Sequence, residues 1–178
     1  EESYGFLAED FVRDKDAVSA VSLMAEIAAW GKEKGMDMNA MLIDIYKTYG
    51  YSKEKGVSLV RQGKSGAEEI AAIMKQFREN PLKTLEVYPV DLVKDFANHE
   101  AKNMATGAVE KIEMTVTSNV LQYFTEDGTK VSIRPSGTEP KIKFYMEVHG
   151  TLASAEEYEA TNVAAEEKLA VIAKELGI

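Results

Sequence analysis

The segment 141–148 constrains the fold more than any other part of the chain, because its residues alternate strictly between apolar and polar types. The apolar positions are Ile142, Phe144, Met146 and Val148. A period of two puts these side chains on one face of an extended strand and leaves a polar face opposite. Half-buried strands of this kind are typical of an antiparallel sheet with one covered face.

A neighbouring hairpin strengthens that prediction. The runs 120–124 and 131–134 flank the pair Asp127-Gly128, and this pair readily adopts the positive φ values of a tight turn. A further strand is expected at 112–116, where apolar residues again alternate with polar ones. The stretch 91–107 has weak periodicity and is interpreted only as a connection.

Apolar residues at three- and four-residue spacing predict four helices. The first covers about residues 16–34 with Asp16 as its N-cap, and the second has Asn39 as its cap and one apolar face. The other two begin at Ser-x-x-Glu capping boxes, Ser65–Glu68 and Ser154–Glu157. Strands and helices together predict an α+β fold, a two-layer antiparallel sheet with helices.

The pattern changes near residue 62, which predicts two domains. Before that point the chain offers two helices and one short strand, Gly56–Gln62. A lone strand must pair with something, so these elements do not make a complete domain. Residues 1–62 are therefore interpreted as the back half of an α/β domain, and residues 63–178 as a separate α+β domain.

Composition excludes several classes of function. The 178 residues carry a formal net charge of -9 and include no cysteine. The charge disfavours nucleic acid and anionic membranes as partners, and the lack of cysteine excludes disulfides and cysteine-based metal centres. Because the chain shows neither a membrane-length apolar run nor a signal-peptide pattern, we expect a cytoplasmic protein.

The segment Arg134–Lys143 carries the clearest chemistry, because it gathers cations, hydroxyls and a glycine into one tight turn. Arg134 offers a planar fork of donors and Lys143 a compact charge, both suited to phosphate oxygens. Ser136 and Thr138 offer hydroxyl groups, and the glycine between them, Gly137, lets backbone amides approach an anion closely. The alternative is an ordinary surface turn, since the same residue types are common in turns.

The string Arg134–Tyr145 closely resembles the phosphate-binding loop in the fourth domain of the α-D-phosphohexomutases, the phosphoglucomutase and phosphomannomutase family. Glu1–Gly5 resembles the sugar-reading loop of the third domain, and Arg13–Asp16 the basic segment that follows it. The resemblance spans the whole chain. It implies that residues 1–62 are the C-terminal part of the third, α/β domain and that residues 63–178 are the fourth domain, with a TATA-box-binding-protein-like fold.

The resemblance also implies roles for individual residues. Glu1 and Ser3 would hydrogen-bond the sugar hydroxyls, and Lys15 would assist proton transfer or contact a phosphoryl oxygen, with Arg13 beside it. The residues that would hold the non-reacting phosphate are Arg134, Ser136, Gly137, Thr138 and Lys143. The implied partners are glucose or mannose 1- and 6-phosphates, the hexose bisphosphate intermediate, and the missing N-terminal domains. The glucose or mannose preference stays open.

The implied activity is that of an isomerase, which moves a phosphoryl group within the sugar. The family's loop with the phosphorylated serine and its Asp-Gly-Asp-type magnesium loop are both absent from this sequence. We therefore expect the chain alone to be inactive and Mg²⁺ to belong to the full-length enzyme. Asp14 and Asp16 have ligand-like spacing, but N-capping accounts better for Asp16, so no bound metal is expected.

Two other functional readings remain open at this point. One is a non-catalytic module that binds sugar phosphates or other anions. The other is a purely structural interaction domain, which would not respond to ligand.

Overall fold

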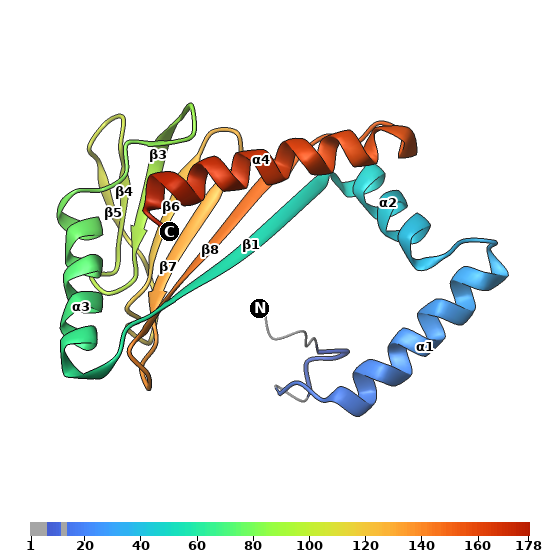
Figure 1. Ribbon diagram of the computed structural model, residues 1–178, viewed down its shortest axis with the longest axis horizontal. Helices are drawn as coiled ribbons and strands as arrows, with labels where there is room; N and C mark the ends of the chain where they lie inside the picture. The colour runs from blue at the N-terminus through green and yellow to red at the C-terminus, as the bar shows by residue number, and fades with distance from the viewer. Residues whose placement is uncertain (1–6, 12–13) are drawn as a thin grey trace. The chain divides into compact units, whose positions relative to one another are not determined.

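A computed structural model of the protein describes residues 7–11 and 14–178 (Figure 1). Within these residues the helices are α1 (Ala17–Glu33), α2 (Met38–Tyr49), α3 (Gly63–Glu79) and α4 (Tyr158–Leu176), with the short 3-10 helix η1 (Ala155–Glu157). The strands are β1 (Tyr51–Val60), β2 (Thr84–Leu85), β3 (Tyr88–Asp95), β4 (Glu100–Asn103), β5 (Val109–Lys111), β6 (Leu121–Thr125), β7 (Lys130–Pro135) and β8 (Lys141–Gly150).

The chain divides into two compact units. The first comprises Thr151–Tyr158 and the part of the chain up to Gly50, and the second comprises Tyr51–Gly150 and Glu159–Ile178. All the strands lie in the second unit, in the order β1-β8-β7-β6-β3-β4-β5, with β2 paired to β3. Every pairing is antiparallel, which confirms the predicted α+β fold.

The core of the second unit lies on one face of this sheet. The four apolar side chains that alternate along β8 are at most 1% exposed, and each contributes about 1.5–3 kcal/mol by its burial. Phe77 of α3 makes edge contacts with the rings of Tyr123 and Phe144 on this face. Helix α4 contributes the buried side chains Ala165, Leu169, Ile172, Ala173 and Leu176.

The helices α3 and α4 therefore cover one face of the sheet, and we call the opposite face the outer face. Residues of β8 with odd numbers and residues of β7 with even numbers point to it, because successive side chains of a strand alternate. They are half-buried or exposed, in contrast to their neighbours. The outer face is the side of the sheet that matters for the site described below.

Strand β1 lies in a different unit of the structure from the one predicted for it. The strand expected at Gly56–Gln62 was assigned to the first domain, but β1 pairs with β8 from Tyr51↔Gly150 to Val60↔Lys141. It is the edge strand of the second unit's sheet, so that assignment is wrong. A boundary at residue 62 between two domains of a longer protein stays a prediction.

The sheet also contains strands where a connection was predicted. Both β3 and β4 lie wholly or largely in the stretch 91–107, so that interpretation is wrong. Strand β3 has an irregular register between Val90 and Leu92, and it ends in the buried carboxylate of Asp95. The apolar alternation is therefore interrupted. Conversely, the predicted strand 112–116 is irregular in the structure, because β5 ends at Lys111.

The predicted N-cap agrees with the structure for α1 but not for α2 or α3. Asp16 caps α1 as expected, since its carboxylate accepts the N–H groups of Val18 and Ser19. The cap of α2 is Asp37, which accepts the N–H of Ala40 at 2.7 Å, and not Asn39. Helix α3 begins at Gly63 without a side-chain cap, so the predicted Ser65 capping box does not form.

Several apolar residues of the first unit are exposed, although Met41 is buried. On α2, Ile45 and Tyr49 are 52% and 84% exposed, and on α1, Val21 is 70% exposed. The apolar face predicted for the second helix is therefore present but is not buried. Among the described helices, none combines the length and the apolar character that a membrane span requires.

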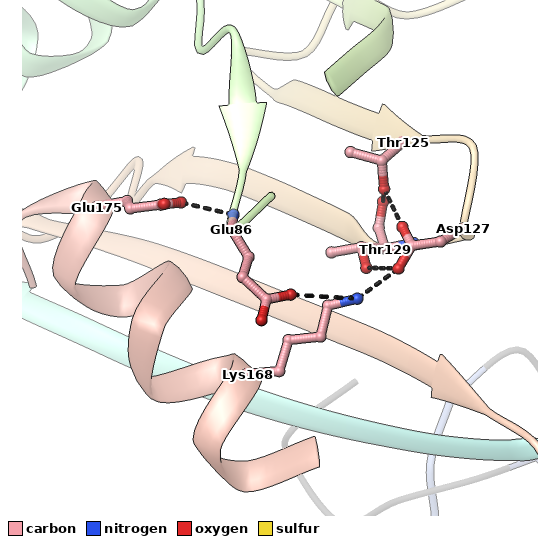
Figure 2. Close-up of polar contacts among 6 residues, drawn as sticks. All are labelled: Glu86, Thr125, Asp127, Thr129, Lys168 and Glu175. Atoms are coloured by element: carbon pink, nitrogen blue, oxygen red, sulfur yellow. Dashed lines mark hydrogen bonds and ion pairs between the residues drawn. The ribbon is translucent and has the colours of Figure 1, made fainter. Parts of the chain in front are cut away.

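A polar cluster ties the hairpin turn to α4, as Figure 2 shows. The ammonium group of Lys168 donates to the carboxylate of Asp127 and lies 3.8 Å from that of Glu86. The hydroxyl groups of Thr125 and Thr129 also donate to Asp127. We call these five residues the Lys168 cluster. It fixes the turn of the β6–β7 hairpin, whose Gly128 has the expected positive φ of 84°.

Candidate anion-binding loop

The candidate site is the loop that joins β7 to β8. Arg134 on β7 and Lys143 on β8 are Cα partners in the antiparallel register. Opposite residues of an antiparallel pair project from the same face of a sheet, so both cations extend from the outer face. The turn of the loop, Ser136–Pro140, lies beyond them at the end of the sheet. The structure thus brings Arg134 and Lys143 together beside Ser136, Gly137 and Thr138.

Hydrogen bonds within the loop fix its shape. The N–H of Ser136 donates to the carbonyl of Lys141 at 2.7 Å, and the N–H of Lys141 donates to the carbonyl of Glu139 at 2.7 Å. The hydroxyl oxygen of Ser136 accepts the N–H of Glu139 at 3.3 Å and lies 3.4 Å from the hydroxyl oxygen of Thr138. Ser136 thus orders the turn besides offering a hydroxyl group.

The far end of the loop is held by β1 and α3. The N–H of Arg61, the residue after β1, donates to the carbonyl of Pro140 at 2.9 Å. Gly66 in the first turn of α3 packs against Arg61 so closely that an added Cβ would lie 2.7 Å from its carbonyl carbon. The start of α3 and the loop therefore both pack against Arg61 at the end of β1. Only glycine fits at position 66, where α3 contacts Arg61.

Lys141 and Arg134 differ in their pairing with acidic residues. Lys141 forms an ion pair with Glu139, with 2.7 Å between Nζ and Oε2, and the hydrogen bond from Lys141 lowers the pKa of Glu139. Most of the charge of Lys141 is thereby balanced inside the loop. Within the described part of the chain, no acidic residue pairs with Arg134.

A cavity of about 460 Å³ lies between the loop and α3. Loop residues 135–140 line one side, and Gly63, Ala67, Ile70 and Met74 line the other. Residue patterns do not indicate that α3 lies beside the loop, because the two are far apart along the chain. Only the pairing of β1 with β8 brings the start of α3 to the loop.

The other predicted site residues all precede α1 in the sequence. Glu1, Ser3 and Arg13 fall outside the described residues. Lys15 lies just before α1, and its backbone N–H donates to the carboxylate of Asp14 at 2.8 Å. It belongs to the first unit and the loop to the second, so the proposed role of Lys15 at the loop stays a prediction.

Comparisons with known proteins identify the family to which this chain belongs. The model of the phosphoglucomutase/phosphomannomutase C-terminal domain matches residues 61–165. A phosphoglucomutase from Staphylococcus saprophyticus is 34% identical over 92% of this chain and 30% of its own length. One from Staphylococcus aureus is 38% identical over 82% of this chain and 26% of its own length.

A solved structure is also similar. It is parafusin, a phosphoglucomutase from Paramecium, in its open form, with 19% identity and a TM-score of 0.47 over 94% of this chain and 29% of that one. The present chain therefore spans less than a third of the length of each of these relatives. The match of the family model confirms the resemblance seen in the loop sequence: this chain belongs to the phosphoglucomutase/phosphomannomutase family, and residues 61–165 match its C-terminal domain.

Proposed function

We propose that the loop binds the non-reacting phosphate group of a hexose phosphate while a longer phosphohexomutase transfers the other phosphoryl group. The observation that carries this proposal is the cross-strand pairing of Arg134 with Lys143 at the root of an ordered Ser136–Thr138 turn. The two cations extend from one face, so both can reach the same anion. The substrate would be a 1- or 6-phosphate of glucose or mannose.

The chemistry of the groups supports this role. A guanidinium group can donate two parallel hydrogen bonds to phosphate oxygens, and an ammonium group adds a point charge. The hydroxyl groups of Ser136 and Thr138 and the amide of Gly137 can satisfy the remaining oxygens. Because the loop is already ordered by its own hydrogen bonds, binding costs little conformational entropy.

The reaction itself is proposed for the longer protein. Phosphoryl transfer depends on positioning and on neutralisation of charge at the transferring group, and this loop would supply the positioning. In the same proposal Glu1 and Ser3 bind sugar hydroxyls, while Arg13 and Lys15 face the reacting phosphoryl group. The whole enzyme would be a cytoplasmic isomerase that turns its hexose bisphosphate intermediate over between two transfers.

Magnesium would belong to the rest of that enzyme. Within residues 7–11 and 14–178, no group of three or more His, Asp or Glu side chains could hold a metal ion. We propose that Mg²⁺ is held in the full-length enzyme by residues that this chain does not contain. The proposal also expects that the chain alone does not convert glucose 1-phosphate into glucose 6-phosphate.

Calorimetric titration of the 178-residue chain with glucose 1-phosphate tests the proposal. We expect millimolar binding that weakens at least tenfold in both Arg134→Ala and Lys143→Met, because each variant removes a charged donor. Lys111→Ala is the matched control, since it removes a cation on β5 that pairs with Glu113. Equal affinity in all four proteins would show that the loop does not bind the phosphate.

A further inference from the structure

Lys143 has an aromatic neighbour on its own strand. Its Nζ atom lies 5.8 Å from the centroid of the Tyr145 ring. The two residues are two positions apart on β8, so both side chains extend from the outer face. An ammonium group within about 6 Å of a ring centroid is attracted by the negative face of the ring. The geometry is that of a cation–π pair.

The neighbours of Tyr145 leave room for this contact. Its cross-strand partners are Gly56 on β1 and Ser132 on β7. Gly56 has no side chain, and a Cβ added there would meet nothing within 4 Å. The hydroxyl group of Ser132 accepts a hydrogen bond from Gln122 at 3.1 Å. Neither partner has a side chain large enough to displace Lys143 from the ring.

Two carboxylates near this part of the outer face, those of Glu147 and Glu139, pair with cations of their own. Glu147, the next residue of β8 on this face, pairs with Lys130 and lies 3.3 Å from the imidazole of His149. Glu139 in the loop pairs with Lys141. An aromatic ring differs from such partners because it orients an ammonium group without adding a formal negative charge.

We infer that Tyr145 is a positioning residue for anion binding: its ring holds the ammonium group of Lys143 on the outer face, at the register of Arg134. This inference rests on the proposed function of the loop. A lysine side chain has four flexible bonds and loses rotamer freedom when it binds. The ring restricts that freedom before the anion arrives, so less is lost on binding.

Two substitutions of Tyr145 distinguish the effect of its aromatic ring from the effect of its hydroxyl group. Tyr145→Phe keeps the aromatic face, and Tyr145→Leu keeps apolar bulk but removes the face. Affinity for glucose 1-phosphate, measured by titration of the 178-residue chain, should be unchanged in Tyr145→Phe and about three- to tenfold weaker in Tyr145→Leu. In a Lys143→Met background, Tyr145→Leu should have no further effect, because the group it positions is gone.

The chain offers a matched control. Lys94 lies 5.2 Å from the centroid of the Phe124 ring on the same face, remote from the loop along the register. Phe124→Leu removes a ring of the same kind and should leave the affinity unchanged. Thermal unfolding of each variant shows whether a loss of affinity merely reflects loss of fold.

A second readout does not depend on ligand. The ring current of Tyr145 should shift the ε-methylene protons of Lys143 upfield in the proton NMR spectrum, and Tyr145→Leu should abolish this shift. An unshifted Lys143 would overturn the inference, and so would equal losses of affinity in Tyr145→Phe and Tyr145→Leu. Binding that is strong in the wild type and unaffected by Tyr145→Leu would overturn the inference alone. No binding by the wild type would overturn the proposed function with it.

Discussion

Arg134 and Lys143 are opposite one another on adjacent antiparallel strands, so two cations from different strands extend from one face of the sheet. The loop between these strands is short and internally hydrogen-bonded. Strand pairing therefore sets the separation of the two charges, and the turn adds neutral donors beside them. The register of β7 and β8 therefore places both residues on the same face of the sheet.

The guanidinium group of Arg134 should contribute to phosphate affinity through paired hydrogen bonds as well as through its charge. Arg134→Lys keeps the positive charge but cannot donate two parallel hydrogen bonds to one phosphate. We expect the affinity for glucose 1-phosphate to fall about tenfold, the effect of one lost hydrogen bond to a charged group. Calorimetry measures this effect. Unchanged affinity would mean that Arg134 acts only as a point charge.

Glu139 should restrain anion binding by occupying Lys141. Glu139→Gln removes the carboxylate and releases the ammonium group at the mouth of the loop. Affinity should rise about two- to fivefold in low salt, because exposed charge pairs are worth little more than this. The gain should disappear in 1 M salt, where screening is strong. A gain that persists in 1 M salt would contradict an electrostatic cause.

The contact between Gly66 and Arg61 predicts a matched pair of substitutions. Gly66→Ala places a Cβ within 2.7 Å of backbone and should destabilise the fold by about 1–3 kcal/mol, as overpacking does. Gly56→Ala meets open space and should change stability by less than about 0.5 kcal/mol. Urea unfolding measures both. Equal effects would show that α3 does not pack tightly on the end of β1.

The Lys168 cluster predicts a loss of stability in acid. Partial burial acts to raise the pKa of Asp127, but hydrogen bonds from Lys168, Thr125 and Thr129 outweigh it and lower the pKa to about 2. A lowered folded-state pKa means that the stabilisation is complete above the unfolded value of 3.8 and is lost as pH falls towards 2. We expect a loss of about 1–2 kcal/mol, allowing for solvent screening.

Urea unfolding at pH 6 and at pH 2.5 checks this prediction for the wild type and for Asp127→Asn. The variant should be less stable at pH 6 and should show a smaller fall in stability between the two pH values. Lys168→Met should behave similarly, since it removes the main donor to Asp127. If either variant loses as much stability as the wild type between the two pH values, the acid sensitivity comes from other carboxylates.

Residue patterns within short segments were enough to predict strand β8 and the turn of the β6–β7 hairpin. The alternation along β8 and the Asp127-Gly128 turn were both confirmed, because burial on one face and a positive φ leave clear traces in residue type. Strand β3 was missed for a physical reason. Its irregular register and the buried Asp95, whose carboxylate pairs with Arg78 at 3.0 Å, interrupt the apolar period.

Long-range pairing was harder to predict. Nothing in the residues of β1 indicates that they pair with β8, since Lys53, Glu54 and Lys55 could flank any exposed edge. The loop residues were identified from their types and their resemblance to a family motif. Their common face follows only from the register, which joins Arg134 to Lys143. The contribution of α3 to the cavity behind the loop depends on β1 and was therefore missed as well.

The most direct test of the account is to follow the backbone amides of Ser136, Gly137 and Thr138 by NMR while glucose 1-phosphate is added to the 178-residue chain. We predict that these three resonances shift together and saturate in the millimolar range, while the amides of the remote strand β5 stay in place. Loop resonances that do not move at millimolar ligand would contradict the claim that this turn binds the phosphate group of a hexose.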